Sequence, residues 1–466
     1  MQIEFFIKNK NNPGIIVPAI LNEHNTCFDL KLYKEYNADE HKINSKIFRP
    51  QKVITKTLDS SILDINGEKI THTVLVDVAR ISLAIQKLIV SRKTAFTTGG
   101  NVTLKSKPSN DQEAEIAELV NETWRKNKLQ YRNADIFRAL ASETEVAEIW
   151  YSKVNLDKTI SLKTKIYTPS DGYELVPIFD AHKDLIAFGL QYATTLNNEV
   201  INHLDIYDEL EIVRYTQRSG YTWVIEEVIQ HNYGKIPVIY YSIKQSVWHD
   251  VQNMIERLEV LMSNFADTND YNGSPILFSN GMIEGWSDKG EQGKLIEGKG
   301  EGAKLEYVSW DSAPESIKLE IEKLTEFIYT ITQTPNISFS EMKGLGDVSG
   351  VAFDRIMIDA HLNATDHHNG SYGEGIQRRI NFLLSALGNI YPNLKIASEI
   401  EITPIFSLFS IDDESDRIDN AMKANGGLPV TSHLDSIKQA GLSDDAEFTL
   451  QQINNQQPVT ATNKNI

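Results

Sequence analysis

The sequence predicts an α+β protein, in which helical and strand-rich segments occupy separate stretches of the chain. Residues 151–244 are rich in β-branched and aromatic side chains and are punctuated by Gly and Asp turns, as expected for a module of hairpins. Long stretches on either side place apolar residues three and four positions apart, which is the period of an amphipathic helix. A chain of 466 residues has room for about three domains.

The first part of the chain predicts strands followed by three helices. Residues 1–70 mix short apolar runs with turn residues, so we expect loops and strands there. Residues 73–93 place apolar side chains at helical spacing, and the TTGG sequence at 97–100 marks the end of this predicted helix. Two further amphipathic helices, rich in Glu, Ala and Leu, are predicted over 111–126 and 133–150.

A pair of comparable helices brackets a glycine-rich insert in the middle of the chain. The first begins at Ser246, and its apolar residues share one face about five turns long. These residues are Val247, Val251, Met254, Ile255, Leu258, Leu261, Met262 and Phe265. The insert, residues 268–311, is expected to form a small β-module with exposed turns. The second helix, residues 312–334, opens on a capping box formed by Ser312 and Glu315.

The last part of the chain is predicted to be helical, with one strand. Residues 335–349 are polar and contain glycine, so we expect a loop, and the next helix begins near Ser349. Three glycines within 370–375 should kink or interrupt this helix. The strand-like sequence EIEITPIF then leads into three short helices within 411–455, and the polar tail, residues 456–466, is expected to be disordered.

Composition and charge exclude several classes of protein. A single cysteine, Cys27, excludes an intrachain disulfide framework and fits a reducing cytosol. There is no apolar run of about 18 residues and no signal-peptide pattern, so we expect a soluble cytoplasmic protein without a membrane partner. The net charge of −18 argues against a protein that grips DNA through many phosphates, but not against a conduit that DNA passes without tight binding.

Motifs that could carry chemistry are weak. The sequence GKGEGAK at 298–304 lacks the Ser or Thr and the following helix of a phosphate-binding loop, so a flexible turn is favoured over nucleotide binding. His361 and His368 lie about 10 Å apart along a helix, too far to chelate one ion. Together with Asp366 and His367 they are interpreted as packed or solvated side chains. The sequence therefore predicts no catalytic, cofactor-binding or metal-binding residue, and no enzyme.

Four local motifs, in order, resemble those of one known family. They are a helix ending in TTGG, the strand sequence HNYGKIPVIYYS at 231–242 that runs into the long helix from Val247, the sequence TPNISFSEMKGLGDVSGVAFDRIMIDAHLNA at 334–364, and the closing sequence ANGGLPVTSHLDSIKQAGLSDDAEFTLQQI. Over roughly residues 70–455 the chain resembles the portal proteins of tailed bacteriophages with long non-contractile tails. The first 70 residues match no family motif.

The resemblance implies a portal fold, divided into named parts. They are an N-terminal region and wing (1–245), a stem of two helices (246–267 and 312–334), a clip (268–311), a tunnel loop (335–349), a long helix that completes the wing (350–410), a crown (411–455) and a tail (456–466). It also implies a homo-oligomeric ring, commonly of twelve subunits, at one capsid vertex of the virion, assembled in the host cytoplasm. Such a ring is the channel for packaging and ejecting double-stranded DNA, without reading its sequence. The implied partners are the large terminase subunit, the head-completion adaptor, and the major capsid and scaffolding proteins; no cofactor is implied.

Five residues are candidates for contact with DNA in this channel. Lys343 is the only basic residue of the loop, and twelve copies would form a ring of positive charge around the DNA backbone. Gly344 and Gly346 would give the loop mobility. Lys318 and Lys323 on the second stem helix are five positions apart and diverge, so at best one faces the channel.

Alternative interpretations stay open at this point. The lysines can equally be ordinary solvated side chains. A minor capsid or adaptor subunit of a phage head would share the lack of chemistry and the acidic surface, but it should lack the paired helices around an insert. An enzyme with an unrecognised nucleotide site should instead show polar residues converging in a deep pocket.

Overall fold

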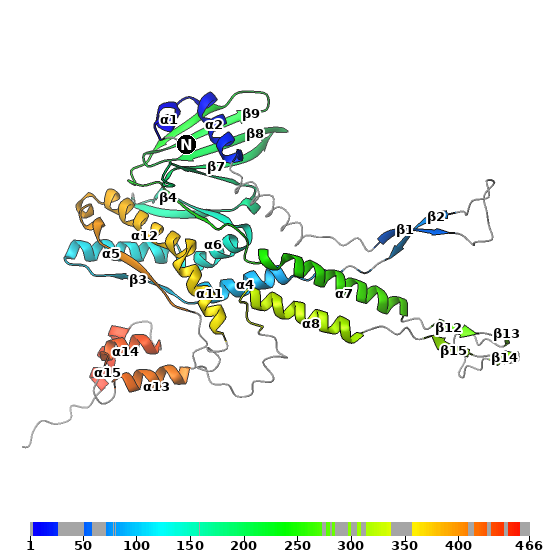
Figure 1. Cartoon of the computed structure of the whole chain (residues 1–466). Coiled ribbons are helices and arrows are strands. Elements are labelled where there is room, and N and C mark those ends of the chain that lie inside the picture. Colours follow the sequence, from blue (N-terminus) through cyan, green and yellow to red (C-terminus); the bar gives the residue numbers. More distant parts are fainter. Residues whose placement is uncertain are drawn as a thin grey trace, which may run out of the picture.

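Figure 1 shows the computed structural model of the chain, in which helices and sheets form distinct parts of an α+β molecule. The predicted α+β class is therefore confirmed. The structure describes residues 3–26, 51–57, 71–77, 79, 81–157, 159–272, 276–279, 282–284, 297–299, 305–308, 314–336, 357–408, 414–425, 430–441 and 446–456. Over these ranges, a search for a helix with the length and apolar character to span a bilayer finds none.

Four layers stack in the body of the molecule. A pair of helices covers an antiparallel five-stranded sheet of order β10-β9-β8-β7-β6, and next comes an antiparallel three-stranded sheet of order β11-β4-β5. Helices α5, α6 and α12 form the fourth layer. The elements are α1 (Ile3–Asn9), α2 (Pro13–Thr26), β6 (Glu174–Phe179), β7 (Leu185–Leu196), β8 (Glu199–Tyr207), β9 (Glu211–Arg218), β10 (Val224–Gln230), β4 (Glu145–Val154), β5 (Ile160–Tyr167), β11 (Val238–Ser242), α5 (Asp111–Lys126), α6 (Leu129–Glu143) and α12 (Ser371–Ile390).

The three-stranded sheet is buried on both faces, which explains the continuous apolar run of β11 and the unbroken burial of residues 145–150 in β4. Neighbouring residues of a strand point to opposite faces, so each strand contributes to two different cores. The core shared with the five-stranded sheet receives Ala147, Ile149, Val238 and Tyr240, whereas the core shared with the helices receives Val146, Trp150, Ile239 and Tyr241. The predicted strand-rich module over 151–244 is confirmed by β5 to β11.

The N-terminal residues differ from the prediction of loops and strands. Residues 3–26 form α1 and α2, whose apolar side chains Phe6, Ile16, Val17 and Ile20 pack on the outer face of the five-stranded sheet. Lys10, between the two helices, pairs with Asp208 and with Glu211, the latter at 2.7 Å. The sheet face supplies a partner that local sequence patterns do not reveal, and this tertiary contact favours the helices.

The predicted helix over 73–93 is wrong in its first half. β2 (Thr71–Asp77) pairs with β1 (Gln51–Thr57), so a strand occupies the start of the predicted helix. Helix α4 begins only at Ile85 and ends at Thr98, close to the predicted TTGG boundary. The intervening residues bind to another helix, α7 (Gln252–Asn272), and this interaction takes the place of helical hydrogen bonds.

Three backbone amides before α4 bond to side chains of α7, an arrangement we call the amide ladder. Ala79 N–H donates to Asp267 Oδ1, Ile81 N–H to Ser263 Oγ at 2.9 Å, and Leu83 N–H to Glu259 Oε1 at 3.0 Å. Two residues of extended chain advance about 6.6 Å, and four residues of helix advance about 6.0 Å. Donors and acceptors therefore stay in step, which holds this segment along α7.

The predicted helix over 133–150 is also wrong in its second half. Helix α6 ends at Glu143, Thr144 adopts a left-handed conformation with φ of 69°, and β4 begins directly afterwards. Every residue from Glu145 to Trp150 is buried, so no alternation marks the strand in the sequence. Glu and Ala in this stretch favour a helix, but pairing with β11 and β5 decides the structure. The predicted helix over 111–126 is confirmed as α5.

The glycines at 370–375 play two different roles. Gly370 separates α11 (Ile358–Asn369) from α12, so the predicted interruption is confirmed there. Gly373 and Gly375 lie inside α12, at points of close packing. A Cβ at Gly373 would lie 1.7 Å from the carbonyl oxygen of His368, and a Cβ at Gly375 would lie 2.0 Å from Cε1 of Tyr241. These two positions require glycine for space.

A buried ion pair ties α12 to the central layers. Arg379 Nε donates to Glu148 Oε2 at 2.7 Å, and both side chains are fully buried. The same guanidinium donates to Asn133 Oδ1 at 2.7 Å and to the hydroxyl of Tyr241 at 3.2 Å, and lies over the ring of Trp124. The Glu148 carboxylate raises the pKa of Arg379, although burial opposes it. A buried charge is tolerated when it is paired and hydrogen-bonded in this way.

The C-terminal part agrees with the prediction. The sequence EIEITPIF contains β16 (Ile402–Phe406), which pairs with β3 (Val102–Ser106). Three short helices follow and contact one another: α13 (Glu414–Asn425), α14 (His433–Ala440) and α15 (Ala446–Gln456). The tail predicted to be disordered lies outside the described residues, apart from Gln456.

Candidate functional site: the projecting helix pair

Two helices, α7 and α8 (Pro314–Ile331), lie side by side and project from the layered body (Figure 1). The short helix η2 (His249–Val251) leads into α7, so the first helix of the predicted pair starts a few residues later than Ser246. Ile255 and Leu258 of α7 and Ile328 of α8 are buried in the main core. Arg257 also bridges from α7 to Glu320 of α8, with an Nε–Oε1 distance of 2.9 Å. The predicted helix pair is confirmed.

The insert between the two helices contains paired strands at the far end of the projection (Figure 1). β12 (Ile276–Ser279) pairs with β15 (Leu305–Val308), and β13 (Met282–Glu284) pairs with β14 (Glu297–Lys299), both in antiparallel register. The predicted small β-module is confirmed by these strands. The lysine of GKGEGAK at position 304 is followed directly by a strand. A phosphate-binding loop requires a helix at that point.

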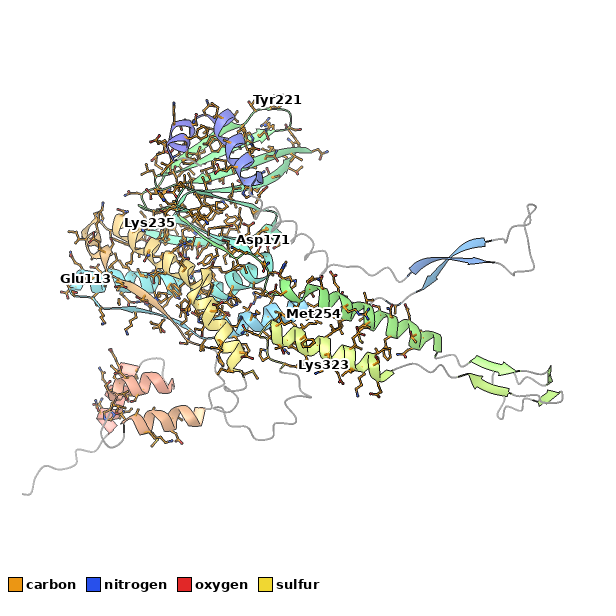
Figure 2. The ribbon with its side chains drawn as sticks, in the orientation of Figure 1. Glu113, Asp171, Tyr221, Lys235, Met254 and Lys323 are labelled. Carbon is orange, nitrogen blue, oxygen red and sulfur yellow. The ribbon has the colours of Figure 1, made fainter. Side chains whose placement is uncertain are left out.

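Acidic side chains dominate both helices of the pair. Helix α7 carries four acidic residues and one basic residue, and α8 carries four acidic and two basic residues. The two basic residues of α8 are Lys318 and Lys323, and both are exposed. Lys323, labelled in Figure 2, donates to Glu326 Oε2 at 2.6 Å, and this hydrogen bond raises the pKa of Lys323. The surface of the pair therefore has a negative balance of charge.

Helix α4 holds the chain where it leaves α8. Arg92 Nη1 donates to the carbonyl oxygen of Pro335, and the guanidinium lies 5.4 Å from the centre of the Tyr329 ring. Gln333, with a positive φ of 51°, accepts a hydrogen bond of 3.0 Å from the side-chain amide of Asn363 on α11. The next residue along α4, Lys93, in turn donates to Asn363 Oδ1 at 2.7 Å. The exit of α8 and helix α11 are thus held to the same helix.

The predicted loop, residues 335–349, begins at this anchored exit. Only Pro335 and Asn336 belong to the described part of the chain. Lys343, Gly344 and Gly346 lie outside the described residues. The structure therefore shows Lys318 and Lys323 exposed at diverging positions on α8, and it leaves the three loop candidates as sequence-based expectations.

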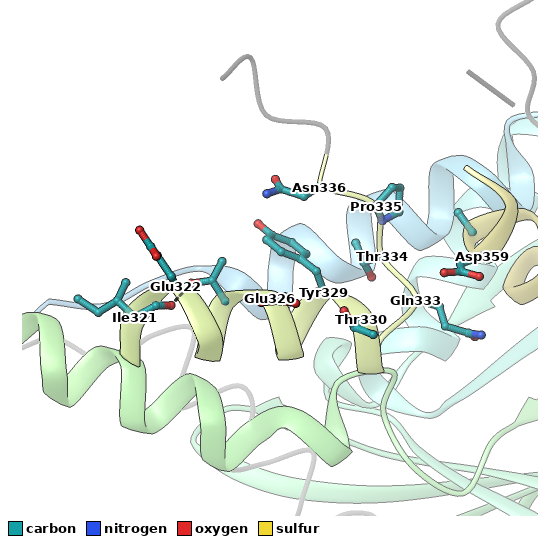
Figure 3. Close-up of a pocket in the computed structure, with 12 residues that line it drawn as sticks. Ile321, Glu322, Glu326, Tyr329, Thr330, Gln333, Thr334, Pro335, Asn336 and Asp359 are labelled. Atoms are coloured by element: carbon teal, nitrogen blue, oxygen red, sulfur yellow. Dashed lines mark hydrogen bonds between the residues drawn. The ribbon is translucent and has the colours of Figure 1, made fainter. Parts of the chain in front are cut away.

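A cavity of about 650 Å³ borders the exit of α8 (Figure 3). Its walls come from α8, from the exit segment and from the start of α11. Glu322, Glu326 and Asp359 contribute carboxylates to the lining. Among the described lining residues there is no basic residue, and there is no histidine, cysteine or serine that could act as base or nucleophile. Within the part of the chain that the structure describes, no group of His, Cys, Asp and Glu side chains is arranged to hold a metal ion.

The histidines of α11 pack against aromatic rings. His361 contacts Phe96 edge to face, and His367 contacts Phe137 with ring centres 4.9 Å apart. His368 stacks on Phe406 at 4.4 Å, and its Nε2 lies 2.7 Å from the carbonyl oxygen of Thr97. Burial lowers the pKa of His367 to about 4. The interpretation of these side chains as packed is confirmed for all three.

These features define a class of protein before any comparison is made. An α+β body carries a projecting helix pair with a strand insert at its far end, and the pockets described here show no constellation of reactive groups. The family described as "Phage portal protein, SPP1 Gp6-like" matches residues 30–457, and the chain belongs to this family. Its members are structural proteins of the bacteriophage virion, where they act as the portal or connector.

Comparisons with solved structures and with curated proteins give weaker similarities than the family match. A solved structure titled "Neck of empty GTA particle computed with C6 symmetry" is similar with a TM-score of 0.40 and 10% sequence identity, over 78% of this chain and 90% of that chain. No curated protein matches the chain. The family match covers the four motifs singled out in the sequence, and their resemblance to portal proteins is confirmed. Helices α1 and α2 precede the matched residues.

Proposed function

We propose that copies of this chain close into a ring that forms the channel for double-stranded DNA at one capsid vertex. The observation that carries the proposal is the projecting helix pair within a chain of the portal family. In a ring of twelve subunits the pairs would stand around a central axis. We propose for the parts of the chain the divisions expected from the sequence: wing (1–245 and 350–410), stem (246–267 and 312–334), clip (268–311), tunnel loop (335–349) and crown (411–455), with the first stem helix extended to the end of α7 at Asn272.

Exposed apolar side chains on α8 support contact between neighbouring copies. Leu319, Phe327 and Ile331 are about half exposed, and Phe327 and Ile331, four residues apart, form a short apolar stripe on the helix surface. In a closed ring each subunit uses two different faces, one for each neighbour. Burying this stripe against the adjacent helix pair would remove apolar surface from water.

The acidic balance of the pair supports a channel wall that does not hold DNA. DNA binds tightly where basic side chains replace its counterions, and a negative wall works against this exchange. Lys318 and Lys323 are exposed on the wall, and Lys323 is already paired with Glu326. Lys343 of the tunnel loop would supply the ring of positive charge, contacting phosphates without reading bases. This combination suits a passage through which DNA slides.

The ring proposal is tested by the size of the purified protein. We expect negative-stain images and sedimentation to show closed rings with a central pore. Replacing Phe327 with glutamate should weaken ring formation, whereas the matched change Leu210→Glu, at an exposed apolar residue of the wing, should not. Wild-type protein that stays a single particle under packaging-like conditions contradicts the proposal.

The role of the loop lysine is tested by packaging in vivo. Lys343→Glu should reduce the yield of packaged genomes while rings still assemble. Lys126→Glu is the matched control, because Lys126 is an exposed lysine on α5 that pairs with Glu122. A wild-type genome yield from the Lys343→Glu variant rules out this contact.

The role of the insert is tested by binding of the packaging motor. We propose that residues 268–311 dock the large terminase subunit first and the head-completion adaptor later, while the crown faces the capsid interior and its scaffolding and major capsid proteins. Deleting the insert should leave the wing folded and abolish pull-down of the large terminase subunit. Retained pull-down contradicts this assignment.

A further inference from the structure

A second cavity lies where four elements of the fold meet at the base of the helix pair. Its volume is about 480 Å³, and its lining comes from these elements, which are α4, the connection between β11 and α7, the exit of α8 and the start of α12, and also from α6 and α11. Lys93, Ser246, Asp366, His367 and Ser371 are among the lining residues. Neither the family assignment nor the proposed channel gives this cavity a role.

Lys93 brings a poorly compensated positive charge to this cavity. The residue is 7% exposed, and its ammonium makes one hydrogen bond, to Asn363 Oδ1 at 2.7 Å. Desolvation lowers the pKa of Lys93 to about 8, and the charge of Asp366 opposes that shift. Among the described residues no carboxylate lies within ion-pair distance of the ammonium. A buried cation with two donors to spare favours a negative partner.

Further unused polar groups face the same space. Ser246 is 5% exposed, and its hydroxyl has no hydrogen-bond partner within the described structure. His367 Nε2 is likewise buried without a partner. Helix α12 starts at the cavity with Gly370 as its N-cap, so no side chain caps it. The first amides of a helix lack intrahelical acceptors and carry partial positive charge, which favours anions.

We propose that this cavity is a binding site for an oxyanion. The anion would accept hydrogen bonds from the Lys93 ammonium, the Ser246 hydroxyl and the first amides of α12. Asp250 and Asp366 also line the cavity, but both are exposed and lie at its rim. The proposal concerns the single subunit, and it does not depend on ring closure or on DNA.

The occupant can be a free phosphate or a carboxylate, because both present oxygens to the same donors. The depth of the donor groups favours a small group over an extended chain. In the folded protein an anion at this point would also lie close to Asn363, which Lys93 shares with Gln333 at the exit of α8. An anion in the cavity would therefore affect the hydrogen bonds at the point where the tunnel loop begins.

Binding should depend on pH in a definite direction. Lys93 loses its proton above pH of about 8, so affinity for acetate, whose own charge is constant in this range, should fall between pH 7 and 9. The charged and titratable groups that line the cavity besides Lys93 are Lys244, Asp250, Asp366, His367 and Tyr372. Burial lowers the pKa of His367 to about 4, so this side chain stays neutral between pH 7 and 9. Burial raises the pKa of Tyr372 above this range.

The experiment measures binding of inorganic phosphate to the purified full-length protein by calorimetry at pH 7, with acetate as a second probe. Lys93→Met should weaken binding about tenfold or more, and Ser246→Ala by a few-fold, because a charged donor contributes more than a neutral one. The matched control is Lys87→Met, which removes an exposed lysine from the same helix, away from the cavity.

The calorimetry results distinguish a phosphate from a carboxylate occupant, and they test the proposal itself. Tighter binding of phosphate identifies a free phosphate as the occupant, and tighter binding of acetate identifies a carboxylate. If neither probe binds, or if Lys93→Met and Lys87→Met bind equally, the cavity is not an oxyanion site. A variant that misfolds is recognised by its circular dichroism spectrum, and Ser246→Ala then decides the question alone.

Discussion

Removing one acceptor of the amide ladder should make the segment before α4 open more often, by a factor that can be calculated. Glu259 is 8% exposed and accepts a hydrogen bond of 3.0 Å from Leu83 N–H. Glu259→Ala leaves that amide without its partner, and a hydrogen bond to a charged group contributes about 1.5–3 kcal/mol. Local opening should therefore become about 10- to 100-fold more frequent, since each 1.36 kcal/mol is a factor of ten. Glu259→Gln retains an acceptor oxygen and should show a much smaller change.

Amide hydrogen exchange measures this opening directly. We expect faster exchange at Leu83 and Ile81 in Glu259→Ala, with little change at Leu140 on α6, which lies in the main core and serves as an internal control. The midpoint of global unfolding should fall less than the local effect, because the two other hydrogen bonds of the ladder remain. Equal exchange in Glu259→Ala, Glu259→Gln and wild type would show that the ladder does not hold the segment.

Three further perturbations test the packing of α12 and its surroundings. Arg379→Met should lower the free energy of unfolding in urea by about 3–5 kcal/mol, because it leaves the buried carboxylate of Glu148 without its partner. The double variant with Glu148→Gln should recover part of this loss. Additive losses in the double variant would contradict the pairing. Gly375→Ala should cost about 1–3 kcal/mol, since its Cβ would overlap a buried tyrosine ring, whereas Gly14→Ala, with no atom nearer than 3.8 Å, should be neutral or stabilising; equal thermal midpoints would refute the steric argument. The pKa of His367 is lowered to about 4 in the folded state, so the unfolded state takes up the proton first and stability should fall by about 2–3 kcal/mol as the pH drops from 6.5 to 4. His367→Leu should flatten this dependence in chemical unfolding measured at several pH values, and an unchanged slope would exclude His367 as its source.

The sequence predicts an element well when the element has one buried and one exposed face, because its apolar residues then recur with a regular spacing. The helix over 111–126 and the helix pair have such faces, and they appear where they are expected, as do the three short C-terminal helices that Gly-containing sequences separate. The strand-rich module is also predicted correctly, because Gly and Asp turns separate its strands. In these elements local preference and tertiary packing favour the same structure.

The errors occur where distant contacts decide the local structure. Residues 145–150 carry no alternation, since both faces of β4 are buried, and the Glu and Ala of that stretch mimic a helix. The segment 79–83 is fixed by side chains about 180 positions away on α7, which no local window contains. Helices α1 and α2 depend on a sheet face that forms from residues 174–218.

The candidate site was predictable only as an outline. The motifs indicate a helix pair, an insert and a loop, and they identify the family, but they do not reveal how α4 anchors the exit of α8. Arg92 and Lys93 occur in an ordinary helical sequence, and only the fold brings them to Pro335 and Asn363. The same holds for Arg379 and Glu148, which are separated by 231 positions and give no local signal of their pairing.

The spacing of the amide ladder fixes the register between the extended segment and α7. Sliding the extended segment by two residues would place an amide opposite position 255 or position 271 of α7. Position 255 is a fully buried isoleucine and position 271 is a tyrosine, so neither offers a carboxylate or a short hydroxyl. A two-residue shift would therefore leave one of the three amides without an acceptor, so the observed register is the one in which all three hydrogen bonds form.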